Sequence, residues 1–175
     1  RRASRWAFER WSAPLAIGDR EAAAFTQGVR EREWSFVDRE SAVFGTPPVH
    51  ALCEQPLFEQ VPPKQQRLAR ALRGSFVGVF TVLSHQDDEV ELEGALDGRR
   101  YRIHEHNSEV RYDAGFIAIG RLIPLGGGRW LRSPGMLIFS SPGNVTARDL
   151  AEGFEKIPAL APALIAEGII AGVTG

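Results

Sequence analysis

The chain has 175 residues, of which 43% are hydrophobic and 25% charged, and its net charge is -1 at pH 7. These values are typical of a globular domain and argue against intrinsic disorder. The near balance of 21 basic and 22 acidic residues argues against a domain built mainly to bind nucleic acid, which is usually strongly basic. The single cysteine, Cys53, excludes an internal disulfide and a cysteine-rich zinc site. With no apolar stretch long enough to span a membrane, this composition predicts a cytoplasmic protein with no membrane partner.

The first part of the chain, residues 1–73, is predicted to be helical. Asp19 is a suitable N-cap for a first helix. Residues 34–44 are expected to form another helix, because Gly45 and two prolines follow them. The clearest helix of the region is 64–73, which starts after paired prolines and stops before a glycine.

In the middle of the chain, residues 74–142, the hydrophobic pattern changes to a period of two. Asp97-Gly98 is a strong signal for a hairpin turn between two of the expected strands. The predicted strands are 76–84, 89–93, 101–106, 116–123, 130–131 and 136–139. Such short strands with tight turns predict an α+β chain with a small antiparallel β-barrel of five to six strands, SH3-like, flanked by N-terminal and C-terminal helices.

The tail, residues 143–175, is again predicted to be helical. Thr146 is placed to cap a helix, and Asp149 lies three positions later, where the acid of a capping box belongs. A second tail helix is expected over residues 159–171. We expect the three regions to form one compact unit.

The pattern of the middle region resembles uncharacterised bacterial domains that are found beside SEC-C metal motifs. It consists of a Phe- and Val-rich strand, a hairpin with a Leu-x-Gly-x-x-Tyr core, and a strand that ends in Arg-Leu-hydrophobic-Pro. The matching residues are Phe80, Leu96, Gly98, Tyr101, Ile103, Glu105, Gly115, Arg121, Leu122 and Pro124. The cysteine-rich motif itself is absent. The resemblance therefore implies a shared bacterial barrel and carries over no activity and no metal site.

The leading functional hypothesis is a non-enzymatic module or scaffold that binds another protein or a neighbouring domain. It follows from the lack of a recognisable catalytic set, and no cofactor is predicted with it. Small barrels often present aromatic side chains to extended peptides, and this analogy rests on the fold alone. The expected groove lies along the barrel beside Tyr101, Tyr112 and Trp130.

A divalent-metal site is the first alternative hypothesis. His104 and His106 are two residues apart on a predicted strand, so their imidazoles are expected on one face. His85 and Asp87 lie in the turn after the first strand and supply further ligands if that turn meets the end of the third strand. The competing interpretation is that these polar residues simply lie at the solvent end of a hairpin.

Nucleic-acid binding is the second alternative. Arg99, Arg100 and Arg102 surround Tyr101 on the hairpin. Arg129 and Arg132 lie near Trp130, and basic residues interleaved with aromatic ones can bind single strands by stacking and phosphate contacts. The acidic segment 85–93 is expected on the neighbouring strand, where cross-strand charge pairing explains the same arginines without a ligand.

Overall fold

The computed structural model describes residues 20–105, 111–141 and 143–153. Its N-terminal part contains the helices α2 (Arg20–Glu33), η1 (Trp34–Asp38, a π-helical turn), α3 (Pro48–Glu54), η2 (Pro56–Gln60, a 3-10 turn) and α4 (Pro63–Arg73). Prolines open α3, η2 and α4, where a missing backbone N–H costs no hydrogen bond. The predicted helices after Asp19 and at 64–73 are confirmed. The predicted helix over 34–44 is wrong beyond Asp38, because the backbone becomes extended at Arg39.

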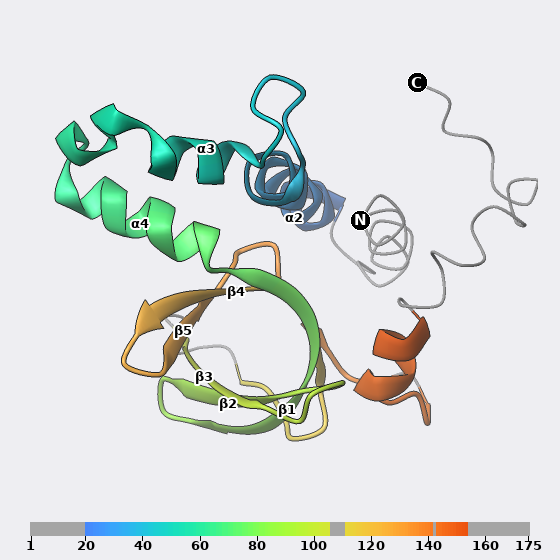
Figure 1. Ribbon diagram of the computed structural model, residues 1–175. Coiled ribbons are helices and arrows are strands. Elements are labelled where there is room, and N and C mark those ends of the chain that lie inside the picture. Colours follow the sequence, from blue (N-terminus) through green and yellow to red (C-terminus); the bar gives the residue numbers. More distant parts are fainter. Residues whose placement is uncertain (1–19, 106–110, 142, 154–175) are drawn as a thin grey trace, which may run out of the picture.

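The strands are β1 (Phe76–Gln86), β2 (Glu89–Gly94), β3 (Arg100–His104), β4 (Ile117–Gly126), β5 (Arg129–Arg132) and β6 (Leu137–Phe139). Their order is β1-β2-β3-β5-β4, and the pairing of β1 with β4 closes the ring. The short strand β6 pairs with the first residues of β4, Ile117 to Ile119. The predicted small barrel in an α+β chain is therefore confirmed (Figure 1). The prediction that all pairs are antiparallel is wrong for β3 and β5, which run parallel. A closed ring of five strands cannot alternate direction at every step, so one parallel pair is required.

Strand β1 pairs with β2 along one edge and with β4 along the other. Phe80 pairs with Gly94 on β2 at one side and with Ala118 on β4 at the other. Farther along, Gly78 lies directly opposite Gly120, and both positions face the interior. A Cβ at Gly78 would overlap the Phe80 ring, so the missing side chain makes room for that ring inside the barrel. The interior is filled by Phe80, Val82, Val90, Leu92, Tyr101, Ile103, Ala118, Leu122 and Met136.

The outer face of β4 is also buried, because helices cover it. Ile117 and Ile119 pack against Ala147 and Leu150 of the helix at residues 147–153. The predicted capping box of this helix is confirmed. Thr146 N–H donates to the Asp149 carboxylate (2.9 Å), and Asp149 N–H donates to Thr146 Oγ1 (3.1 Å). The expected tail helix at 159–171 lies outside the described residues.

Arg121 joins the N-terminal helices to the barrel. It points outward from β4, yet only 2% of it is exposed. Its guanidinium donates to Ser75 Oγ (2.9 Å) and Glu33 Oε2 (3.3 Å) and pairs with Asp38 at the end of η1. This buried cation therefore holds the end of α2 and η1 against β4.

The described helices cover only one side of the barrel. Helices lie against β4 and one side of β1, while no described helix lies over the outer faces of β2 and β3 (Figure 1). Among the described residues, the outer face of β2 and β3 is therefore the side of the barrel without a covering helix.

Candidate functional site

Two of the three aromatic residues predicted to line a peptide groove lie inside the barrel. Tyr101 is 7% exposed, and Trp130 packs against the interior cluster from β5. Their ring centroids are 5.4 Å apart, and both rings contact Phe76. Both rings thus pack in the core, Tyr101 almost completely and Trp130 in part.

Tyr112, the third of these residues, lies at the end of the barrel. Its ring stacks on His85 with a centroid separation of 5.3 Å. Its backbone N–H donates to His85 Nδ1, which is the acceptor at 3.1 Å. The Tyr112 hydroxyl donates to Glu105 Oε2 (3.0 Å).

Glu105 is a buried carboxylate that organises this end of the barrel. It is 3% exposed and receives two hydrogen bonds from Arg132, at 2.7 and 3.0 Å. Its own backbone N–H donates to the carbonyl of Asp88 in the β1–β2 turn (2.7 Å). Because a guanidinium and a phenol both bind this carboxylate, Glu105 holds the segment after β3 in place. The sequence does not predict the partnership with Arg132, because the two residues are 27 positions apart in the chain and only the closed barrel brings them together.

The residues predicted to bind metal are not all brought together. A β-bulge in β1 between Val82 and Ser84 shifts the register, so His85 lies opposite Val90 and faces the interior. His104 lies opposite Glu89 on the outer face. His106 lies outside the described residues, and Asp87 lies exposed in the turn with φ of 52°. Within residues 20–105, 111–141 and 143–153, no group of three or more His, Cys, Asp or Glu side chains is placed to hold a metal ion. A metal site therefore stays a prediction that depends on His106.

The arginines predicted to bind nucleic acid belong to a charged ladder on the outer face of β2 and β3. Three acid–base pairs lie opposite one another there: Glu89 with His104, Glu91 with Arg102, and Glu93 with Arg100. Arg100 also reaches Glu91 diagonally (3.7 Å), and Arg99 lies 3.8 Å from Asp97 in the hairpin turn. The predicted cross-strand charge pattern is thus present, and the aromatic residue between these arginines points inward.

A surface that the sequence did not indicate lies between η1 and α3. Residues 41–46 form a turn closed by its own backbone, with Gly45 N–H donating to Ser41 C=O (2.8 Å) and Ser41 N–H to Thr46 C=O (3.1 Å). Gly45 has φ of +66°, which favours glycine over other residues. Val43 and Phe44 at its tip are 84% and 55% exposed.

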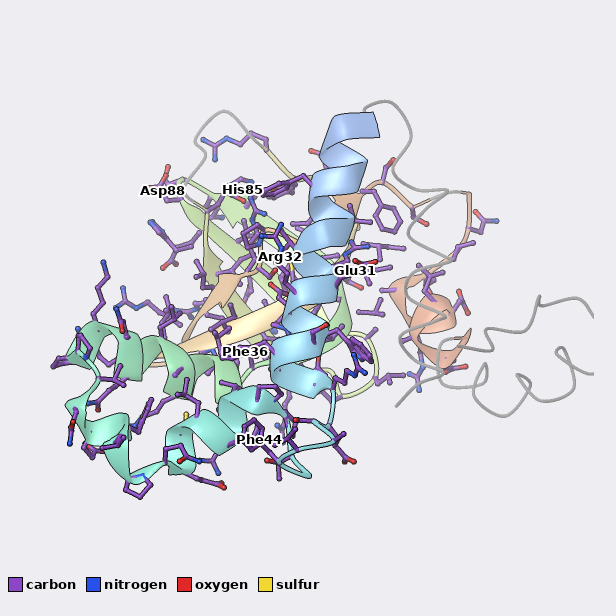
Figure 2. All side chains as sticks on the ribbon, turned by 90° about the horizontal axis from the view of Figure 1, so that it is seen from above. Glu31, Arg32, Phe36, Phe44, His85 and Asp88 are labelled. Carbon is purple, nitrogen blue, oxygen red and sulfur yellow. The ribbon has the colours of Figure 1, made fainter. Side chains whose placement is uncertain are left out.

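A second exposed aromatic residue lies on η1, a few positions before the 41–46 turn in the chain. Phe36 on η1 is exposed and borders a shallow depression on α2 that Glu31 and Arg32 also line. Figure 2 shows Phe36 and Phe44 at the end of α2 where the chain turns into α3. Sequence reasoning placed Phe44 inside a helix. The signal that it missed is Ser41 followed by Gly45, a pattern typical of a turn.

Comparisons with protein-family models, with curated proteins and with solved structures found no match to this chain. In the part of the chain that the structure describes, every helix is too short or too polar to cross a membrane. The functional argument therefore rests on the geometry of this chain alone.

Both tyrosines of the protein should titrate abnormally. Burial, opposed by Arg132 and assisted by the bond to Glu105, raises the pKa of Tyr112 to about 12. Burial first, and then Asp97, raise the pKa of Tyr101. Because the phenols lose their protons less readily in the folded state, their contribution to stability is complete below pH of about 10 and is lost as pH rises through the folded pKa values.

Ultraviolet absorbance of tyrosinate during a pH titration measures this effect. At a pH of about 10, half of the tyrosine side chains are ionised in the urea-unfolded chain, and we expect little tyrosinate in the native protein. Tyr112→Phe should leave one tyrosine titration, that of Tyr101, with a pKa that is still raised. A native titration that coincides with that of the unfolded chain would contradict the buried contacts of both residues.

Proposed function

We propose that this chain is a non-enzymatic protein-binding module that docks on another protein or a neighbouring domain through its 41–46 turn. The observation that carries the proposal is the exposure of Val43 and Phe44 at the tip of a turn that its own hydrogen bonds close. We place the module in the cytoplasm, because a chain with one cysteine needs no oxidising compartment.

The energetics of the 41–46 turn favour a partner. Burying a Val or Phe side chain is worth about 1.5–3 kcal/mol relative to leaving it in water. Val43 and Phe44 remain in water and do not contribute this stabilisation, and neither belongs to the cluster that fills the barrel. An apolar pocket on a partner would recover it, and aromatic side chains are common energetic centres of interfaces.

The turn is also preorganised for docking. Ser41 Oγ accepts a hydrogen bond from Val43 N–H (3.2 Å), and the backbone pairs between Ser41, Gly45 and Thr46 fix the loop. Pro47 and Pro48 follow it directly and restrict the backbone on the α3 side. A turn that is already ordered loses little conformational entropy on binding, so more of the contact energy contributes to affinity.

Photo-crosslinking in cells of the protein's natural host tests the proposal. A benzophenone amino acid placed at Phe44 should give a discrete crosslinked protein, and Val43→Ser should abolish it by removing the neighbouring apolar contact. The matched control carries the same probe at Leu125, which is 53% exposed on β4 and lies outside the turn. Because Val43 is exposed, its replacement should change the free energy of unfolding by less than about 0.5 kcal/mol.

Three results would overturn the proposal. One is the absence of any discrete product at Phe44, and another is a product of equal size and yield at Leu125. The third is a crosslinked band that persists in Val43→Ser at full strength. A product with twice the mass of the chain would identify the partner as a second copy.

A further inference from the structure

Two arginines lie side by side on the uncovered wall of the barrel. Arg102 on β3 and Arg129 on β5 are directly paired in the parallel register. The next pair, Ile103 with Trp130, faces the interior, so both arginines point outward, and both are exposed. Adjacent strands are separated by roughly 4.8 Å, which lets two long guanidinium side chains converge on one ligand.

Within the described residues, neither arginine makes a close ion pair, although Glu91 is the cross-strand neighbour of Arg102. Glu91 lies opposite Arg102 on β2, but its ion pair is with Arg100 at 3.7 Å. Like charges in adjacent strand positions repel each other and disfavour folding. A bound anion would remove that repulsion and would use donors that the fold leaves free.

We infer that Arg102 and Arg129 form a binding site for a single phosphate group carried by a small molecule. Each guanidinium offers a planar fork of N–H donors that matches two phosphate oxygens. Two forks from neighbouring strands can engage different oxygens of one tetrahedral dianion. This site lies on the barrel wall, and the 41–46 turn belongs to the helical region, so the inference does not depend on the proposed docking surface.

The surroundings of the pair favour a small ligand over a nucleic-acid chain. The acidic stripe Glu89, Glu91 and Glu93 runs along β2 beside the arginines and would repel a continuous phosphate backbone. The nearby rings of Tyr101 and Trp130 pack against the interior cluster, so among the described residues little of either ring is left for bases to stack on. One phosphate can lie over the arginine pair without crossing the acidic stripe.

Calorimetric titration of the whole chain, in a chloride buffer, tests the site with inorganic phosphate and with a nucleoside monophosphate as probes. Arg102→Gln and Arg129→Gln should each reduce the association constant about tenfold or more, since each removes charged hydrogen bonds. Arg102→Lys should retain part of the affinity, because it keeps the charge but loses the fork. Arg67→Gln on α4 is the control, since that arginine is exposed and isolated from the pair.

Three results of this calorimetric titration would overturn the inference. These are no measurable binding of either probe, unchanged affinity in both glutamine variants, and an equal loss in Arg67→Gln. A single-stranded oligonucleotide serves as a further arm. If it binds more tightly than the nucleoside monophosphate, with a steep dependence on salt, the wall is a nucleic-acid surface and the small-ligand inference is wrong.

Discussion

Replacing Arg121 by alanine should lower the free energy of unfolding by about 3–5 kcal/mol, the largest effect that we expect from a single substitution. The variant loses one of the largest fully buried side chains and leaves a cavity beneath η1. It also leaves Glu33, whose side chain is 18% exposed, without its cation. Asp38 contributes less to the loss, because its side chain is 40% exposed and water can solvate it. Urea denaturation followed by circular dichroism measures the change.

Two further variants separate the role of Arg121 from general effects of removing a cation. Arg121→Lys should fall between the wild type and the alanine variant, because one ammonium group cannot reach Glu33, Asp38 and Ser75 together. Arg67→Ala, at an exposed position of α4, should change stability by less than about 0.5 kcal/mol. An Arg121→Ala loss as small as that of Arg67→Ala would refute the network as the joint between the helices and the barrel.

Gly120→Ala should destabilise the protein by about 1–3 kcal/mol, although it adds one methyl group. A Cβ at this position would lie 2.6 Å from the Met136 Cα, and that atom belongs to the backbone. The segment between β5 and β6 would have to move away from β4, which disrupts the pairing of β6 with Ile117, Ala118 and Ile119. Thermal and urea unfolding of the variant give the measurement.

The cause of the Gly120 effect can be checked with two controls. Gly28→Ala on α2 should stabilise the protein by about 0.5–1 kcal/mol, since its nearest neighbour is the end of the Arg32 side chain at 3.7 Å. Met136→Ala should not rescue Gly120→Ala, because the clash is with the main chain. Full rescue by Met136→Ala would mean that the methionine side chain, and not the backbone, needs the space.

Local features of the fold could be predicted from the sequence because they depend on neighbours in the chain. The alternation around Val90 and Leu92 predicted which face of β2 is buried, and both residues are fully buried. The Asp97-Gly98 turn and the Thr146–Asp149 capping box were predicted in the same way. Each of these signals lies within a few residues and follows from backbone geometry.

The candidate sites depended on long-range contacts and could be predicted only in part. The bulge before Ser84 turns His85 to the interior, whereas unbroken alternation from Phe80 would place it outside with His104. The pairing of Arg102 with Arg129 exists only because the parallel closure brings β5 beside β3. The charged ladder of β2 and β3 was predictable, since a hairpin fixes its register locally.

The sequence by itself determined the helix-barrel-helix order, the inward faces of the strands, and the near-neutral charge that disfavours a nucleic-acid domain. Only the tertiary structure decided that Arg121 is buried, because its partners Glu33 and Asp38 are 88 and 83 residues away in the chain. It likewise decided that Val43 and Phe44 are exposed in the 41–46 turn and that Arg102 and Arg129 are register neighbours on adjacent strands. Short-range patterns encode backbone geometry, whereas burial and charge pairing arise from contacts that the closed barrel creates.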